Sequence, residues 1–492
     1  MQTSSIMPGI YSCWRSRQRI LSLILAVLAI FHAGSVLAAN ANGPSISFTN
    51  AWQTAQSNSD FLASSHANVE RAQLKQDSLR GLSFPSVDLV GTYTHLNDTV
   101  TADALDYNPF TFLESSPVGQ EIIGLIGGPE AFQTDIIDQN FGRIALEALW
   151  PVYTGGRVTA ARDASAAQTD VAKQQQDIQR RALFEELVRV YFGVALAQQN
   201  LQIHSDMEHD LGLHLGNAIK LEEQGQIAAV ERLSVAAVYE RTKVGTERAE
   251  RELEIARITL AEMLLHESAA DPSDMLFIND SLPAEEEFLT ATLNNSPLLK
   301  ELKAHDRQAD ALIRAEKGSL RPEVFLYADW EIYKDNSIIL QYVPDWQVGI
   351  GVNFTLLDRV VRNKSIDAAH KAQESVGRIT QGTKRFLDLA ARVAHREANQ
   401  ALSQYAGLEA SVALAQENLR LRNKAFLEGF STSVELVDAE LFMASVLTEQ
   451  SAAAYAYIVS LARLLALTGD MDSFASYQVR GIQLDSNERT TP

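Results

Sequence analysis

An internal repeat with two fixed offsets constrains this 492-residue chain more than any other feature. At an offset of 237 residues three pairs match: Asn58 with Asn295, Gly81 with Gly318, and Pro85 with Pro322. At an offset of 204 three more match: Gly225 with Gly429, Val230 with Val434, and Glu231 with Glu435. The offsets differ because residues 98–140 correspond to only ten residues, 335–344. The chain is therefore two similar halves, not the three domains that length alone suggests.

Each half contains two segments with the alternating pattern of a β-strand. In 347–354, apolar residues at even positions alternate with Gln347, Gly349, Gly351 and Asn353 at odd positions. The expected strands cover about 84–97, 141–154, 322–334 and 345–357. The alternation gives each strand one apolar face. It does not distinguish a strand whose apolar face contacts lipid from one whose apolar face packs on the core of a soluble protein.

Long regions without proline predict unusually long helices. Residues 152–271 and 345–491 contain no Pro. A heptad seam runs through Leu387, Ala391, Ala394, Ala398, Ala401 and Tyr405. Helices over 158–221 and 361–427 would each be about 95 Å long. A shorter return helix follows each long helix. In each half, the return helix and the opening helix, near 47–82 or 285–319, could stack end to end beside the long helix.

The N-terminus has the pattern of an export signal. Three basic residues, Arg15, Arg17 and Arg19, precede a short apolar run over residues 20–31. A small-x-small cleavage site then ends at Ala38. About 12 strongly apolar residues are too few to span a bilayer, so we expect a signal peptide over 1–38.

Charge and cysteine content narrow the class of function. The formal net charge is −20, and it becomes −23 without residues 1–38, which hold three Arg and no acid. The lone Cys13 leaves with the same segment. An acidic chain is not expected to bind nucleic acid, and a chain without cysteine has no disulfide framework or cysteine metal site. Neither a P-loop nor an H-E-x-x-H motif is present, so we expect no enzyme, cofactor or metal.

The strand count poses a closure problem. Four strands are too few to close a barrel, and a bilayer does not tolerate an open sheet edge. Either the strands form part of an exported soluble coiled-coil interaction protein of the periplasm, or several chains pool their strands.

Three motifs then carry a family resemblance: Gly81-x-x-x-Pro85 before a strand, the run from Trp150 to Arg157 after one, and the run from Phe426 to Glu440. With the repeat, they resemble the TolC-like outer-membrane efflux family over about 47–469. The resemblance implies a mainly α fold with a small β part. In such a homotrimer, three chains pool four strands each into a 12-stranded outer-membrane barrel in contact with lipid. The long helices continue the barrel as a periplasmic tunnel.

The resemblance also implies partners and a passive role. The chain would serve an inner-membrane transporter and a periplasmic adaptor in a tripartite efflux or type I secretion system of a Gram-negative bacterium. Its cargo, whether drug, protein, peptide or metal, is not encoded in this chain.

The same resemblance assigns residues. Glu435 and Asp438 would form a gate ring whose mutual repulsion raises some of their pKa values and which could hold a polyvalent cation; the alternative is a pair of solvated acids at a helix start. Possible gate contacts are Glu231, Phe426 and Ser431, the last standing where some relatives carry an Arg that pairs with the acid. Adaptor-docking turns would contain Gly225, Gln226, Gly429, Phe430 and Thr432, although such glycine turns also serve as plain connections. The aromatic girdle would contain Tyr93, Trp150 and Trp330.

The expected organisation is a first efflux repeat over 39–270, a second over 271–470, and a polar C-terminal tail over 471–492. The insertion 98–140 would be an extracellular loop. It holds eight acidic residues and no Lys or Arg. It is interpreted either as a solvated loop or as an acidic lid that favours cations.

Overall fold

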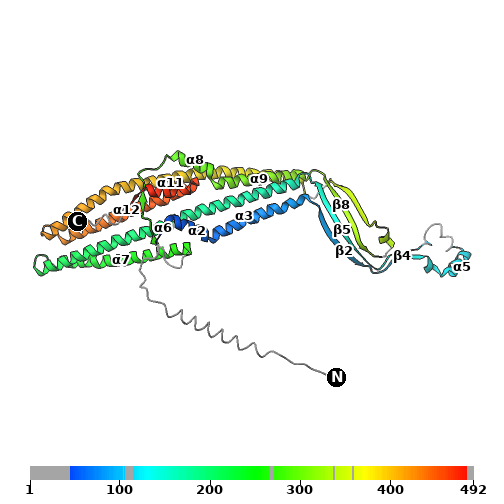
Figure 1. Ribbon diagram of the computed structural model, residues 1–492, viewed down its shortest axis with the longest axis horizontal. Helices are drawn as coiled ribbons and strands as arrows, with labels where there is room; N and C mark the ends of the chain where they lie inside the picture. The colour runs from blue at the N-terminus through cyan, green and yellow to red at the C-terminus, as the bar shows by residue number, and fades with distance from the viewer. Residues whose placement is uncertain are drawn as a thin grey trace, which may run out of the picture.

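The protein is elongated, with a helical part and a β part that follow each other along its long axis (Figure 1). The computed structural model describes residues 45–103, 105, 115–265, 271–335, 338–356 and 360–484. The expected signal peptide, residues 1–38, lies outside these ranges.

Two helices run the length of the helical part. They are α6 (Arg157–Glu223), of 67 residues, and α11 (Arg362–Leu427), of 66 residues. Both agree with the helices expected from the proline-free regions. The expected Ala-rich seam of α11 is buried, with Ala394 and Ala398 fully covered. Small side chains there allow neighbouring helices to approach closely.

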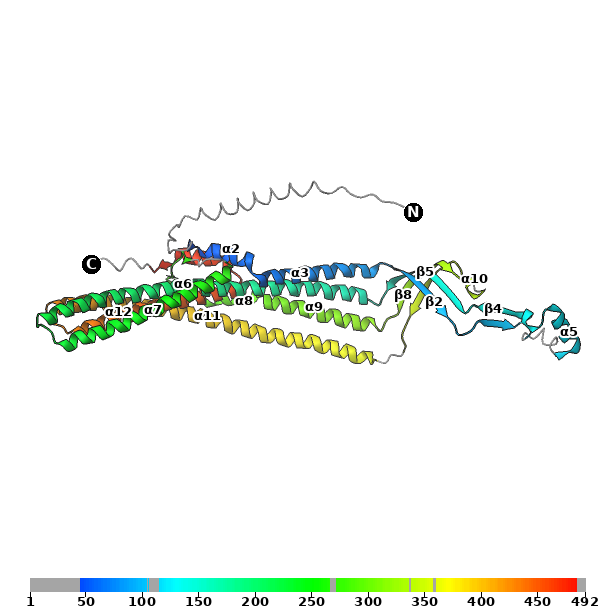
Figure 2. The same cartoon turned by 90° about the horizontal axis from the view of Figure 1, so that it is seen from below.

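Shorter helices pair up beside the long ones. The return helices α7 (Ala229–Leu264) and α12 (Ser433–Thr468) have 36 residues each. The opening helices are broken in two, into α2 (Phe48–Asn58) and α3 (Asp60–Ser78) in the first half and α8 (Glu285–Asn295) and α9 (Pro297–Gly318) in the second. In Figure 2, α3 and α9 cover the half of the bundle next to the β part, and α7 and α12 cover the other half.

Each break contains an Asn-Ser pair at equivalent positions of the repeat. Asn58 Nδ2 donates to the Leu264 carbonyl oxygen at 3.0 Å, and Asn295 Nδ2 donates to the Thr468 carbonyl oxygen at 3.0 Å. These carbonyls end the return helices, where backbone oxygens have no intrahelical donor. The following Ser59 and Ser296 cap the next helix by accepting from the backbone N–H three residues on. We call these two places the helix joints.

An aromatic cluster fills the middle of the molecule. Phe48, Phe184, Phe192 and Phe277 pack around Phe474, which is 1% exposed, with ring centroids 4.8–5.9 Å apart. Two short sheets border the cluster: β1 (Ser45–Ile46) with β6 (Asp271–Pro272), and β7 (Phe277–Ile278) with β10 (Ile482–Gln483).

The expected polar tail over 471–492 is therefore wrong for its described part. The segment forms η4 (Met471–Ser473), α13 (Phe474–Arg480) and β10. Three of its apolar residues, Met471, Phe474 and Leu484, are buried in the core, whereas Val479 and Ile482 are exposed. Residues 485–492 lie outside the described ranges.

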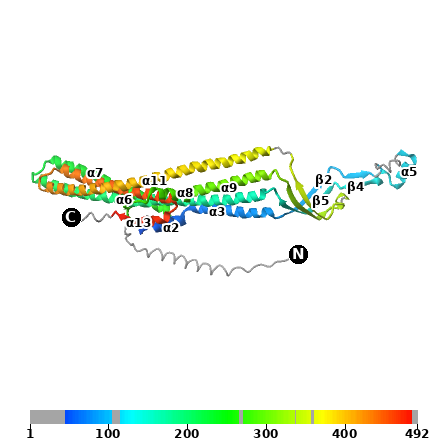
Figure 3. The same cartoon turned by 90° about the horizontal axis from the view of Figure 1, so that it is seen from above.

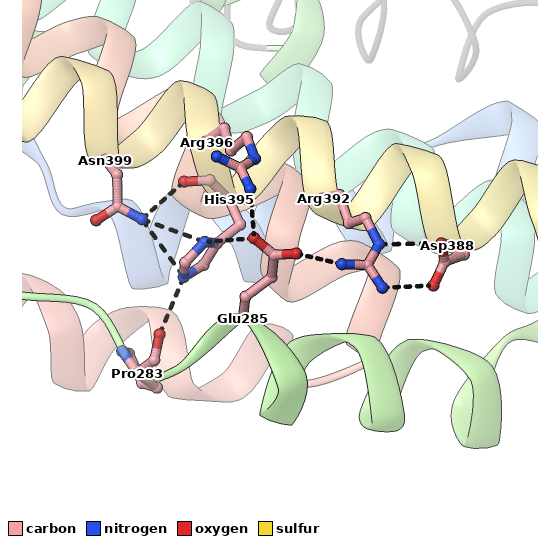
Figure 4. A network of polar contacts seen from close by, with 7 residues as sticks. All are labelled: Pro283, Glu285, Asp388, Arg392, His395, Arg396 and Asn399. Carbon is pink, nitrogen blue, oxygen red and sulfur yellow. Dashed lines mark hydrogen bonds and ion pairs between the residues drawn. The ribbon is translucent and has the colours of Figure 1, made fainter.

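A charged network fastens α8 to α11 (Figure 4). Glu285, in the first turn of α8, accepts from Arg392 Nη1 at 2.6 Å and lies 3.7 Å from Arg396. Arg392 also donates to Asp388, and His395 Nε2 lies 3.0 Å from the Pro283 carbonyl oxygen. The Glu285 side chain is only 16% exposed, whereas Arg392 and Arg396 are 44% and 78% exposed, so the carboxylate is the covered partner of ion pairs that lie at the surface and join α8 to the middle of α11.

The β part is a four-stranded antiparallel sheet in the order β2-β5-β8-β9. The strands are β2 (Ser86–His95), β5 (Asn140–Tyr153), β8 (Glu323–Lys334) and β9 (Trp346–Asn353). The register places apolar side chains of all four strands on one face, where Leu89 and Ile350 are each 67% exposed. Within the described chain, β2 and β9 are the two open edges.

The insertion contains ordered structure rather than a plain loop. Strand β3 (Val100–Asp103) pairs with β4 (Gln133–Ile137), and this ribbon projects away from the four-stranded sheet (Figure 3). At its tip lies α5 (Pro117–Ile126), followed by η3 (Pro129–Phe132). Two smaller elements complete the described chain, η1 (Leu79–Ser83) and α10 (Ile338–Gln341).

We expect Asn295→Asp to weaken the second helix joint more than Asn295→Ala. Alanine removes one hydrogen bond, which costs about 1 kcal/mol, whereas aspartate places a carboxylate against the Thr468 carbonyl oxygen. Chemical unfolding followed by circular dichroism measures both changes. Asn294→Ala, at an exposed position on the same helix, is the control. Equal stability of all three variants would contradict the role of the joint.

Candidate functional site

The end of the helical part opposite the sheet is formed by two tight turns, residues 224–228 and 428–432. Gly225 and Gly429 have φ of 74° and 76°, a left-handed conformation that glycine adopts without steric cost. The next residue of each turn donates back over five residues, from Gln226 N to the Leu221 oxygen and from Phe430 N to the Ala425 oxygen, both at 2.8 Å. These bonds are a Schellman motif, which ends a helix and reverses the chain.

Glu435 closes the start of α12. Its Oε2 accepts from Thr432 N at 3.2 Å, while Glu435 N donates to Thr432 Oγ1 at 3.3 Å, a complete capping box. Ser431 Oγ donates to the same carboxylate at 2.6 Å, and Arg422 Nη1 lies 2.9 Å from it. The Ser431 hydroxyl, the Thr432 N–H and Arg422 hold the pKa of Glu435 below its ordinary value of 4.5. Within one chain, therefore, the contacts of Glu435 lower its pKa and do not produce the expected rise.

Glu231, the repeat equivalent of Glu435, is used differently. The residue that would cap α7 is Ala228, which has no side-chain acceptor. Glu231 Oε2 instead accepts from Ser433 N, at 3.3 Å, on the other turn. Ser431, at the position of the missing Arg, contacts Glu435 rather than Glu231. The two turns are thus joined by a carboxylate-to-backbone bond.

The remaining turn residues divide into buried and exposed sets. Phe426 is buried, and its ring lies edge-on to that of His214 at 4.5 Å, so it packs between α6 and α11. Phe430 is 84% exposed at the tip, and Gly225, Gln226, Gly429 and Thr432 are exposed too. A cavity of about 290 Å³ lies between the turns, lined by Gln226, Glu231, Phe426 and Ser431 among others.

Glu435 and Asp438 are both exposed on one face of α12, as their spacing predicts. Only Glu435 takes part in the capping and Arg422 contacts described above. The two acids share a face of α12, but Glu435 is also bound to the cap of that helix and to Arg422 of α11.

The three candidate girdle residues all lie on the apolar face of the sheet. Tyr93 is paired with Gly142, and Trp150 lies eight residues further along β5, about 26 Å away at 3.3 Å per residue. At the tilt of about 40° that barrel strands adopt, this separation corresponds to a height of about 20 Å, somewhat less than an apolar band of about 25 Å in lipid. Trp330 pairs with Leu146, about midway between the two levels. Tyr93 and Trp150 therefore lie near opposite ends of this face, and Trp330 lies between them.

Sequence reasoning missed a buried acid just above the turns. Glu440 is 7% exposed, and burial together with the nearby carboxylate of Asp210 raises its pKa to about 8. Burial likewise raises the pKa of Asp210 on α6. The spacing of Ser433, Leu436, Val437 and Glu440 follows one helix face, and this pattern could have identified Glu440 as inward-facing.

Comparison with known proteins decides the family. The family model described as outer membrane efflux protein matches residues 51–264 and 289–470. The chain belongs to this family. It is an efflux channel of the outer membrane of Gram-negative bacteria that extends into the periplasm, and membership in a family of channels confirms the expectation that it is not an enzyme.

Solved structures of similar fold agree with this membership. The outer-membrane channel OprN matches with a TM-score of 0.70 at 16% identity, over 86% of this chain and 90% of that one. The open state of the Neisseria gonorrhoeae channel MtrE matches with a TM-score of 0.67 at 17% identity, over 86% and 89%. The Campylobacter jejuni channel CmeC matches with a TM-score of 0.66 at 13% identity, over 93% and 96%. No curated protein sequence matches the chain significantly.

One described helix, α12, has the length and composition of a membrane span. Most of its apolar stretch is buried against other helices, as in the core of a helical bundle. The four-stranded sheet, by contrast, exposes a whole face of apolar side chains, among them Leu89, Val348 and Ile350.

We expect Glu440→Gln to stabilise the protein in a pH-dependent manner. An unfolded Glu ionises near 4.5, whereas folded Glu440 ionises near pH 8. Between these values the folded state holds a proton that the unfolded state has lost, so stability falls as pH rises from about 4.5 to about 8. Glutamine removes that loss, a gain of about 4 kcal/mol at pH 8 that vanishes below pH 4.5.

Guanidinium unfolding of the detergent-solubilised protein at pH 4.5, 6, 8 and 9 measures this gain. Glu449→Gln, at an exposed acid of the same helix, is the control and should show no comparable trend. A gain that is the same at every pH would contradict the burial of an ionisable Glu440.

Proposed function

We propose that three copies of this chain form a passive export duct that works with a periplasmic adaptor and an inner-membrane pump. The open four-stranded sheet is the observation that carries the proposal. Its two edges, β2 and β9, have unpaired backbone groups, and one whole face exposes apolar side chains. Open strand edges are not tolerated in a bilayer, and an apolar face of this extent is unfavourable in water. Both are resolved if copies join edge to edge into a closed 12-stranded barrel whose apolar face contacts lipid.

The same sheet disfavours the alternative of a soluble coiled-coil protein. Exposed apolar faces of this extent mark a surface that is covered in the working molecule. The helical part would then continue the barrel through the periplasm, and the exposed turn residues, with Phe430 at the tip, would meet the adaptor. The pump would supply energy and the choice of cargo.

Disulfide trapping across the two sheet edges tests the duct. The chain has one cysteine, Cys13, within the expected signal peptide, so substituted cysteines report alone. Ile350→Cys on β9 is combined in turn with cysteine at Val87, Leu89 and Gly91 on β2. We expect oxidation of at least one of these pairs to give cross-linked bands on a denaturing gel, the largest of which contains three chains. Ala148→Cys, on the central strand β5, is the control partner and should not cross-link to β9. If the largest cross-linked band contains two chains, or if no cysteine pair cross-links, the trimer is ruled out.

For the gate, we propose that Asp438 carries more of the ring charge than Glu435. Three chains would place both acids around one axis, but Glu435 is already paired with Arg422 and the α12 cap. Exposed carboxylates without a nearby cation attract a polyvalent ion more strongly.

We therefore expect Asp438→Asn to weaken block by hexaamminecobalt(III) by about tenfold, which corresponds to about 1.4 kcal/mol. Glu435→Gln should weaken it less, and the double variant most. Single-channel recordings with the ion on the periplasmic side measure the block, and Glu428→Gln, at an exposed acid on the turn itself, is the control. Unchanged block in the double variant would remove these acids from the gate.

A further inference from the structure

Two glycines of β9 lie directly under two aromatic rings of β8. The register pairs Gly349 with Tyr327 and Gly351 with Phe325. A Cβ added to Gly349 would lie 2.5 Å from Tyr327 Cζ, and one added to Gly351 would overlap the Phe325 ring. The rings therefore occupy the space that side chains at these two positions would fill.

This close approach is specific to Gly349 and Gly351 among the glycines of the four-stranded sheet. A Cβ on Gly91 would meet nothing nearer than 4.0 Å, and one on Gly142 would meet its nearest atom at an ordinary 3.5 Å. Glycine inside a strand lowers stability, so a pair of them under a pair of rings calls for a reason. Aromatic side chains that cover a cross-strand glycine restore part of the lost packing.

The rings lie on the polar face of the sheet. Residues paired directly across two strands share a face, so Phe325 and Tyr327 lie with Gly349 and Gly351, opposite the exposed apolar set of Val348, Ile350 and Val352. The same face carries Asp88, Glu147 and Asp329, one on each of three neighbouring strands, and Gln347 donates to Asp329 at 2.7 Å. In the duct proposed above this face lines the water-filled passage.

We propose that Gly349 and Gly351 hold Phe325 and Tyr327 flat against the wall, so that the two rings set the width of the passage at the helical end of the sheet. The inference rests on the proposed trimeric duct, in which three copies would place six rings at this level. A side chain in place of either glycine pushes a ring off the wall and into the passage. The rings also offer an apolar contact surface to the apolar parts of a bulky cargo. The neighbouring acids Asp88, Glu147 and Asp329 face its polar parts.

Labelling from outside intact cells tests the width. Asn353 lies on the same strand and face as the glycines, beyond them toward the helical end, and Gln347 lies before them at the other end. Asn353→Cys and Gln347→Cys, made separately, serve as reporters for maleimide-polyethylene glycols of increasing mass. A reagent that enters through the outer mouth must pass the rings to reach the first reporter but not the second.

We expect Gly349→Val with Gly351→Val to slow labelling of the Asn353→Cys reporter by the larger polymers at least tenfold and to leave the Gln347→Cys reporter unchanged. Gly91→Val, on the apolar face of the sheet, is the control for a glycine-to-valine change that meets no ring, and it should behave like the parent. Phe325→Ser with Tyr327→Ser should have the opposite effect and admit larger polymers. The serine pair keeps the test decisive if the valine pair does not assemble.

An unchanged size limit at the Asn353→Cys reporter in both the valine and the serine backgrounds would overturn the inference. Failure of the duct itself gives a different result. In that case the parent reporter at position 353 shows no dependence on polymer size, because no passage limits the reagent.

Discussion

The helix joints are the interactions on which the shape of this protein depends. A helix that stops inside a bundle leaves backbone carbonyls without donors, and a second helix can continue its line only if those oxygens are satisfied. Asn58 and Asn295 supply the donors, and Arg181 adds bonds to the Ala466 and Leu467 oxygens at the second joint. Two short helices therefore run in line beside one long helix in each half, and the bundle keeps a continuous wall from the sheet to the turns.

The two halves show how one ancestral pattern serves two purposes. Ala228 replaces the capping Thr432 at the equivalent position, so the first turn has no side-chain cap of its own. Glu231 is then free to bind the backbone of the second turn, whereas Glu435 binds its own. The two halves differ at the cap position, and the equivalent glutamates differ with it: Glu435 caps its own helix, whereas Glu231 contacts the other half. Equivalent residues of the repeat therefore do not make equivalent contacts.

Much of this architecture could be predicted from residue patterns, because long-range order here follows local rules. The absence of proline predicts α6 and α11, and strict alternation predicts β9. The breaks at Ser59 and Ser296 were not predicted, because a helix period continues across a capping serine. The folded 471–484 segment was mistaken for a polar tail because its three buried anchors are widely spaced among polar residues. Glu440 was missed because burial of an acid depends on which helix lies opposite, and Asp210 is 230 positions away in sequence.

The joints also divide the bundle mechanically. From joint to turn, α12 has 36 residues, a lever arm of about 54 Å at 1.5 Å per residue. A tilt of ten degrees about the second joint displaces the tip of such an arm by about 9 Å. Because α12 meets the joint through side-chain bonds and not through continuous backbone, such a tilt unwinds neither α12 nor α9, and only the continuous helices α6 and α11 would have to bend. The centre of such a tilt would lie where the repeat places Asn295, at the opposite end of α12 from the turn.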